Sequence, residues 1–129
     1  CHKSDDNSLH RMFNVAQPGT YIRAHWHRHP PKDESLLVMQ GAICAFIFDD
    51  EGQIQQQVLL GAGSNEFGID IAAGVCHSFV VLQADTVLFE VKPGPYNPQT
   101  DKDFAEWAPA EGTDQAATFL AELQQRIAR

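Results

Sequence analysis

Short runs of alternating apolar and polar residues fill positions 11–93, and Gly, Pro or Asp residues separate the runs. Alternation with a period of two is typical of β-strands that bury one face, because successive side chains point to opposite sides of a sheet. Short strands at regular spacing indicate a sandwich or a barrel. The sequence therefore predicts an all-β fold, with strands at 11–16, 20–27, 35–40, 42–48, 54–60, 67–71, 77–82 and 86–92.

The pattern changes after Lys92. Segment 93–98 contains three prolines, which cannot continue a hydrogen-bonded strand ladder, so we expect an irregular crossing there. Further on, Thr113 or Asp114 can cap a helix that runs to about Ala128. Apolar residues recur within it at helical spacing, namely Ala117, Leu120, Leu123 and Ile127. The pattern predicts an amphipathic C-terminal helix packed on the barrel.

The length of 129 residues suits one domain, which we divide into a barrel with its Pro-rich closing segment at 1–110 and the helix at 111–129. A hydrophobic content of 43% and a net charge of −8 describe an ordinary acidic globular protein. Such a chain is not expected to bind nucleic acid, which attracts basic surfaces. Every apolar run is shorter than a bilayer span requires, so no membrane partner is expected either.

The cysteines are Cys1, Cys44 and Cys76, an odd number at wide spacing. This argues against a disulfide framework and favours a reducing compartment, so we expect the protein in the cytoplasm. Cys44 lies in an alternating apolar run and is expected to be a buried small hydrophobe. The chain begins at Cys1 rather than Met, and this start lacks the features of a signal peptide.

Candidate chemistry is concentrated at His25, His27 and His29, which alternate and are followed by Glu34. On a β-strand such residues share one face. Imidazole and carboxylate are usual ligands for a borderline divalent metal. His77, at the start of another predicted strand, is placed to add a ligand from a distant segment. The pattern predicts one divalent metal ion, and the ligand types leave Fe, Mn, Ni and Zn open.

The spacing of these residues resembles the first motif of the cupin superfamily, which contains a glycine, a His-x-His pair, a glutamate and a closing glycine. The matching positions here are Gly19, His25, His27, Glu34 and Gly41. Gly74 and His77 resemble the end of the second cupin motif, although Ala72 and Val81 replace its usual proline and asparagine. The resemblance implies a small double-stranded β-helix, the cupin jelly-roll barrel, in which His25, His27, Glu34 and His77 bind one metal.

The register of the first motif leaves an alternative. Cupins usually place three or four residues between the second His and the Glu, whereas six separate His27 from Glu34. Pairing His27 with His29 restores four but separates Gly19 from the first His by seven residues. Because His29 precedes two prolines, which end a ladder, we expect it at the barrel rim. We prefer His25 and His27 as ligands and keep His29 as a rim residue or alternate ligand.

Over nearly the whole chain the sequence is similar to the WbuC family of cupin-fold metalloproteins. The similar segments are 10–14 (HRMFN), 18–21 (PGTY), 31–34 (PKDE), 90–96 (EVKPGPY) and 100–109 (TDKDFAEWAP). That family takes its name from bacterial surface-polysaccharide gene clusters. The resemblance implies a metal-binding protein whose small-molecule ligand is sugar-derived or anionic. It also implies a homodimer, since cupins commonly dimerise, and 11–16 is a candidate edge strand for that contact.

Alternation along 20–27 places Tyr21 and Arg23 on the same face as His25 and His27. We therefore expect both to point into the barrel, as substrate-binding residues and candidate catalytic residues. A guanidinium there would suit a carboxylate, phosphate or sulfate, unless it pairs with an internal acid such as Glu90. Glu90 is the third catalytic candidate: facing inward it would be a general base or a neighbour of the metal ligands, and facing outward it would be solvated.

Four protein ligands leave one or two coordination positions open on the metal, as catalysis requires. The leading hypothesis is a metal-binding cupin with a small-molecule pocket, in which metal-dependent catalysis can take place. The alternatives are a non-catalytic binding or sensor module and an Fe(II) dioxygenase. Whether the protein is an enzyme stays open at this stage.

Overall fold

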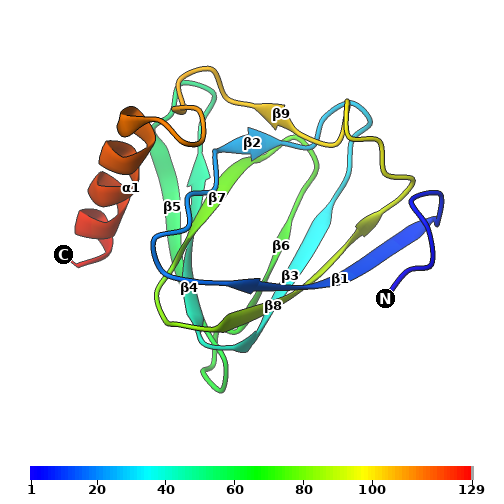
Figure 1. The fold of residues 1–129 in the computed structure, drawn as a ribbon, viewed down its shortest axis with the longest axis horizontal. Helices are drawn as coiled ribbons and strands as arrows, with labels where there is room; N and C mark the ends of the chain where they lie inside the picture. Colours follow the sequence, from blue (N-terminus) through cyan, green and yellow to red (C-terminus); the bar gives the residue numbers. More distant parts are fainter. Residues whose placement is uncertain (129) are drawn as a thin grey trace.

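The computed structural model describes residues 1–128, which form two antiparallel sheets facing each other, with one helix outside them (Figure 1). The first sheet has the order β1 (Leu9–Ala16), β8 (Thr86–Pro93), β3 (Glu34–Gln40) and β6 (Gly68–Ile71). The second has the order β5 (Ile54–Gly61), β4 (Ala42–Phe48), β7 (Cys76–Val81), β2 (His25–Trp26) and β9 (Asp103–Phe104). The predicted all-β barrel with a C-terminal helix is confirmed.

The strand expected over 20–27 is much shorter than predicted, because only His25 and Trp26 pair in a ladder. The residues before them are held by separate hydrogen bonds: Ser78 Oγ donates to the Ile22 carbonyl, and the amide of Ala105 donates to the Ala24 carbonyl. This segment is therefore extended without being part of the ladder. Strand β9 was not predicted, since its two residues follow a proline-rich crossing.

The barrel interior changes from apolar to polar along its strands. On β7 the inward side chains are His77, Phe79 and Val81, of which Val81 belongs to the apolar cluster between the sheets. On β3 the corresponding order is Glu34, Leu36 and Val38. Alternation keeps these side chains on one face, so each strand carries the core at one end and polar groups at the other.

Helix α1 (Asp114–Ile127) covers the outer face of the second sheet (Figure 1). Its N-cap is Thr113, whose side chain accepts a hydrogen bond from the Ala116 amide at 3.1 Å. Leu120 and Leu123 are buried against a cluster that includes Phe46 of β4. The domain division at 110 stays a prediction, and residue 129 lies outside the described residues. In the part that the structure describes, no helix is long and apolar enough to span a bilayer.

The buried thiols lie in the same cluster as the helix contacts. Burial raises the pKa of Cys44 to about 11 and that of Cys76 to about 12. A thiolate is the reactive form, so these two side chains should be inert in the folded protein. Cys1, by contrast, is exposed.

We therefore expect a disulfide reagent at pH 8 to modify one thiol quickly in the native protein and the other two only in denaturant. Absorbance of the released thiolate, followed with time, measures this. The Cys1→Ser variant is the control and should show no fast phase. Fast reaction of three thiols in the wild-type protein would contradict the burial of Cys44 and Cys76.

Candidate metal centre

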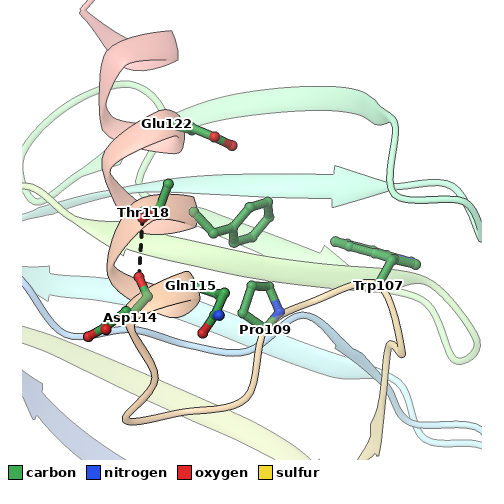
Figure 2. Close-up of a pocket in the computed structure, with 7 residues that line it drawn as sticks. Trp107, Pro109, Asp114, Gln115, Thr118 and Glu122 are labelled. Carbon is green, nitrogen blue, oxygen red and sulfur yellow. Dashed lines mark hydrogen bonds between the residues drawn. The ribbon is translucent and has the colours of Figure 1, made fainter.

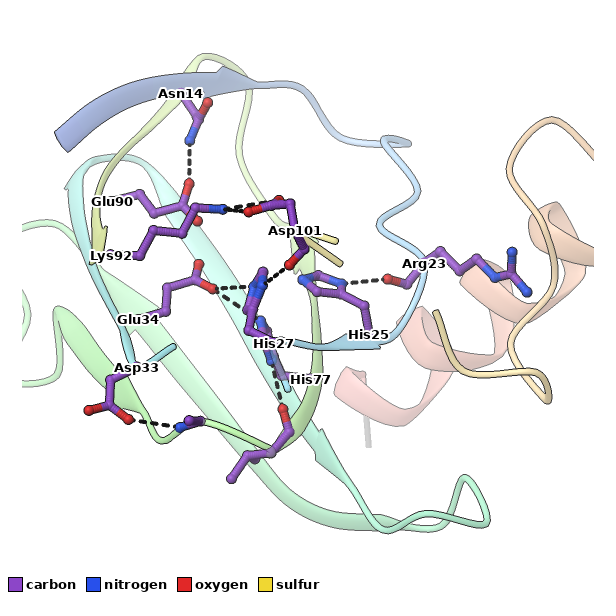
Figure 3. Close-up of polar contacts among 12 residues, drawn as sticks. Asn14, Arg23, His25, His27, Asp33, Glu34, His77, Glu90, Lys92 and Asp101 are labelled. Carbon is purple, nitrogen blue, oxygen red and sulfur yellow. Dashed lines mark hydrogen bonds and ion pairs between the residues drawn. The ribbon is translucent and has the colours of Figure 1, made fainter. Parts of the chain in front are cut away.

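The candidate ligands come from three separate elements that meet inside the barrel (Figure 3). His25 on β2 lies opposite His77 on β7 in the antiparallel register. His27 follows β2 directly, and Glu34 is the first residue of β3 in the facing sheet. All four side chains are buried, and one ligand atom from each lies within 4.8 Å of the others. Fold topology alone therefore brings the four residues together.

The acid lies between two of the imidazoles. Oε2 of Glu34 is 3.0 Å from Nε2 of His27 and 3.4 Å from Nε2 of His77. The ring centroids of His25 and His77 are 4.4 Å apart. Three ring nitrogens and a carboxylate oxygen therefore face a common point.

Hydrogen bonds from the opposite side of each ring determine which nitrogen carries the proton. The Nδ1 atoms of His25, His27 and His77 are bonded to the carbonyls of Arg23 (2.8 Å), Asp101 (2.6 Å) and Val75 (3.0 Å), respectively. A carbonyl only accepts hydrogen bonds, so each Nδ1 is the donor. In a neutral ring this leaves the Nε2 lone pair free and directed at the cluster.

These donor atoms fit a metal cation. When the His27 ring is neutral, its Nε2 and the ionised Glu34 carboxylate are both acceptors, so the 3.0 Å contact between them then has no proton to share. Nε2 of His27 and Oε2 of Glu34 are accordingly buried without a hydrogen-bond partner. Buried acceptors at this spacing are satisfied either by a shared proton or by a metal cation between them. Three imidazoles and one carboxylate form a ligand set for a borderline divalent ion.

The electrostatics of the site favour the protonation states that bind metal. Burial, and then the charge of His77, lowers the pKa of His25 to about 3, so this ring is neutral at physiological pH. Burial alone would raise the pKa of Glu34, but hydrogen bonds that His27 and His77 donate when their rings are protonated outweigh it and hold the pKa below its usual range. A neutral imidazole and an ionised carboxylate can coordinate without first losing a proton.

A cavity of about 540 Å³ adjoins the cluster inside the barrel. His25, Glu34 and His77 form part of its wall. Its apolar lining includes Met12, Ile22, Leu36, Phe79 and Leu88. A volume of this size holds a small molecule, and the mixture of apolar walls with a few polar groups is typical of ligand sites.

Glu90 faces into this cavity from β8, and it accepts a 2.9 Å hydrogen bond from Asn14 Nδ2 (Figure 3). Of the two orientations considered from the sequence, the structure has the inward one. Burial, followed by the hydrogen bond and charge of Glu34, raises the pKa of Glu90 to about 8. This carboxyl group can therefore hold a proton at neutral pH beside an ionised ligand residue.

The raised pKa of Glu90 has a measurable consequence for the metal-free protein. A carboxyl group whose pKa rises on folding from 4.5 to about 8 contributes stability below pH 4.5 and loses it as the pH rises through 8. The free energy of unfolding of the wild type, relative to that of Glu90→Gln, should therefore decrease steadily between about pH 5 and pH 8, the interval between the two pKa values of Glu90. Urea unfolding of both proteins in chelator measures the difference.

Taking a difference removes the opposing contribution of His25, which both proteins share. His25 has a lowered pKa, so its contribution is present above pH 6.5 and is lost as the pH falls towards 3. A difference between wild type and Glu90→Gln that does not change with pH would show that Glu90 keeps its ordinary pKa.

A second hollow, of about 370 Å³, lies beside helix α1 (Figure 2). It is lined by Trp107, Pro109, Asp114, Gln115, Thr118, Phe119 and Glu122. These residues belong to the helix and to the segment before it, on the outer side of the second sheet. The hollow is therefore separate from the cluster inside the barrel.

Comparisons with known proteins agree on the architecture. Oxalate decarboxylase from Bacillus subtilis is 18% identical with a TM-score of 0.60, over 75% of this chain and 24% of that one. The capsular polysaccharide assembling protein CapF from Staphylococcus aureus is 22% identical with a TM-score of 0.60, over 78% of this chain and 27% of that one. BH2720 from Bacillus halodurans is 21% identical with a TM-score of 0.60, over 70% and 66%. This chain has the cupin fold.

The same comparisons do not assign the chain to a family within this fold. The chain spans about a quarter of the length of oxalate decarboxylase and of CapF, so these likenesses concern one barrel of a longer protein. A family model described as a domain of unknown function, DUF6016, matches residues 1–60. None of the curated proteins matches. Membership of the WbuC family stays a prediction.

In this cupin barrel, Tyr21 and Arg23 do not face the cavity, so their expected orientation is wrong. The Tyr21 hydroxyl donates to the Pro109 carbonyl at 2.7 Å. Arg23 donates to the carbonyls of Ala108 at 3.0 Å and Ala105 at 3.3 Å, and it makes no bond to Glu90 (Figure 3). Strict alternation fails because residues 20–24 lie outside the ladder.

The inward positions of this segment are instead Thr20 and Ile22, which line the cavity, followed by His25. Thr20 and Ile22 follow the period of two, but the next inward side chain is His25 instead of residue 24, so the alternation shifts by one residue there. Tyr21 and Arg23 fasten the segment to 105–109 and are structural in the described contacts.

His29 lies outside the cluster. It is exposed in a turn that is closed by a bridge between Arg28 and Pro31, and its place at the barrel rim stays a prediction. The amide of Lys32 donates to the His27 carbonyl at 3.2 Å, so the chain returns to the neighbourhood of His27 after the turn. The turn accommodates the six-residue interval before Glu34, so His25 and His27 are the pair that the fold brings to Glu34.

Sequence reasoning missed three residues at the site: Asn14, Lys92 and Asp101. Asn14 binds Glu90, and Lys92 forms a buried ion pair with Asp101. Alternation along 86–92 does place Lys92 on the same face as Glu90. The Asp101 carbonyl, which binds His27, is a backbone group, and no side-chain pattern identifies it.

Proposed function

We propose that this chain binds one divalent metal ion through His25, His27, Glu34 and His77 and takes a small polar molecule into the adjoining cavity. The convergence of three Nε2 lone pairs and a carboxylate in a buried position, with no proton donor between them, supports the proposal most strongly. A metal bound there would supply Lewis-acid activation of water or of a ligand oxygen. Fe, Mn, Ni and Zn remain the candidate ions.

We propose catalysis rather than passive binding, because Glu90 places a proton-carrying group in the cavity next to the metal ligands. Its raised pKa, at about 8, suits the exchange of a proton with a bound molecule near neutral pH. Asn14 holds one carboxyl oxygen of Glu90, which orients the other oxygen. Ile22, Leu36 and Phe79 give the cavity an apolar wall beside this group.

The ligand class that we propose is sugar-derived and polar. The similarity to WbuC proteins supports it, as does the fold shared with CapF, a capsular polysaccharide assembling protein. One CapF structure holds the inhibitor 3-isopropenyl-tropolone, which supports a small-molecule pocket in this barrel. An anionic ligand would have to be bound by Lys102 of the cavity lining, because Arg23 faces away and Lys92 is paired with Asp101.

Two measurements test the proposal. Metal analysis of protein purified without a His tag should find about one equivalent of a divalent ion. Thermal stabilisation of the metal-loaded protein should then be screened with neutral sugars, sugar acids, sugar nucleotides and small carboxylates. Absence of metal after reconstitution with each candidate ion would end the proposal. A stabilising ligand without turnover would identify a sensor, and oxygen consumption with a thiol or catechol would identify a dioxygenase.

We also propose a homodimer and a cytoplasmic location. The outer face of the first sheet exposes apolar side chains, of which Phe13 is 58% and Val15 67% accessible on the edge strand β1. The strip continues from Phe13 to Phe89 and Leu37 in register, so a two-fold related copy would present a matching surface. The free cysteines support the location. Phe13→Glu should shift light-scattering mass from dimer to monomer.

A further inference from the structure

His27 differs from the other two ligand histidines in how its ring is held. His25 and His77 each bond a carbonyl two residues earlier in the chain, so the local strand conformation supplies the partner. His27 instead bonds the carbonyl of Asp101, which is 74 residues away in the sequence. The orientation of His27 therefore depends on how another part of the chain is fixed.

A buried ion pair fixes that part of the chain. Nζ of Lys92 lies 3.0 Å from Oδ1 and 3.2 Å from Oδ2 of Asp101. The Lys92 side chain is 6% exposed and that of Asp101 is 8% exposed. The Asp101 amide also donates to the Asn97 carbonyl at 2.8 Å, which closes the turn. Both the side chain and the amide of Asp101 are thus bonded, leaving its carbonyl in a defined position for His27 (Figure 3).

Burial keeps Lys92 and Asp101 together. Two charges that lose their water need each other, so the Lys92 side chain cannot leave Asp101 without stranding a charge. The bond from His27 to the Asp101 carbonyl is the shortest of the three imidazole-to-carbonyl bonds, at 2.6 Å. Bonds of this kind select the tautomer and the ring orientation of a ligand histidine.

We propose that Lys92 and Asp101 are positioning residues of the metal centre: their ion pair holds the carbonyl that keeps the proton on Nδ1 of His27 and presents Nε2 to the ion. The inference rests on the proposed function, because it assigns these residues a role towards a metal that the cluster would bind. Their effect is carried by one of the four ligands, since the other histidines have local partners.

The test compares Lys92→Met/Asp101→Leu with the wild type. The double substitution removes both charges together, so neither is left buried alone, and the backbone carbonyl remains. Competition with a chromophoric chelator should show zinc bound 10–100-fold more weakly, as expected roughly for loss of an outer support. In the metal-free protein, nitrogen-15 NMR of the rings should show His27 changing from Nδ1-protonated to a tautomer mixture, while His25 and His77 stay unchanged.

Lys32→Met is the matched control. Lys32 is also buried, at 5% exposed, and donates to the Pro95 carbonyl at 2.7 Å, without contacting Asp101. It should retain wild-type zinc affinity and a wild-type His27 signal even where its melting temperature falls. Equal weakening in this control and in the double variant would overturn the inference, because the effect would then be general loss of stability.

The remaining outcomes separate this inference from the proposed function. A folded double variant with wild-type affinity and an unchanged His27 tautomer would overturn the inference and leave metal binding intact. If the wild type itself binds no metal, the proposed function fails, and an unchanged tautomer in the variant refutes the inference as well. Should the double variant not fold, Lys92→Met/Asp101→Asn retains the side-chain volumes more closely while it still removes both charges and ends the ion pair, and an unchanged His27 tautomer in it would count against the inference.

Discussion

Replacing His77 by alanine should weaken zinc binding on the order of 100-fold or more, because outer supports of metal ligands alone are worth about 10–100-fold and His77 is one of the proposed ligands. The substitution removes one of the four converging donors and leaves Glu34 facing an empty position. Metal content after gel filtration, and competition with a chelator for the affinity, measure the loss.

His29→Ala is the control for this experiment. His29 belongs to the same sequence triplet but is exposed in the turn, so its removal should leave metal content unchanged. Circular dichroism should confirm that both variants fold. Equal metal content in the wild type, His77→Ala and His29→Ala would rule out the cluster as the binding site, and loss in His29→Ala alone would assign the site to the other histidine pair.

Removing the metal should lower the melting temperature by about 16 °C. A ligand present at about 1,000 times its Kd contributes about 4 kcal/mol to the folded state, and about 4 °C per kcal/mol is expected for a domain of this size. The contribution is large because Glu34 and the imidazoles would otherwise face one another as buried acceptors. Differential scanning calorimetry with and without chelator measures it.

The same scan on His77→Ala provides the comparison. In this variant the difference between zinc and chelator should fall to about 6 °C or less, because binding weakened about 100-fold leaves zinc at only about 10 times its Kd, which contributes about 1.4 kcal/mol. A chelator effect as large in the variant as in the wild type would mean that the stabilising ion binds elsewhere. An unchanged wild-type melting temperature would mean that the folded protein has little preference for the ion.

Sequence analysis located well the strands that pair with a neighbouring strand along most of their length. Along β3, β7 and β8 the inward series from Glu34, His77 and Leu88 follow the period of two, because at least one neighbouring strand pairs with each of them along most of its length. The segment around Ile22 lacks such a ladder, so its alternation slips before His25. Strand β9 depends on pairing with a distant partner, which local pattern cannot reveal.

The candidate site likewise has features that the sequence predicts and features that it does not. The convergence of His25, His27, Glu34 and His77 was predictable because ligand types and glycine spacing are properties of side chains and turns. The orientation of Arg23 was not, since it depends on carbonyls contributed by 105–108. The partner of His27 is likewise a backbone oxygen, whose position depends on tertiary contacts and not on residue type.

The gradient from apolar to polar groups along single strands has a consequence for how this barrel can diverge. Val81 and Val38 pack in the core at one end of β7 and β3, while Phe79 and Leu36 line the cavity nearer the other end. On β7, a substitution at Val81 therefore changes the core, whereas a substitution two residues away at Phe79 changes the wall of the cavity. Ligand preference can be altered by changing the partly buried Phe79, whereas a change at Leu36 would affect both the cavity and the cluster that holds the sheets together.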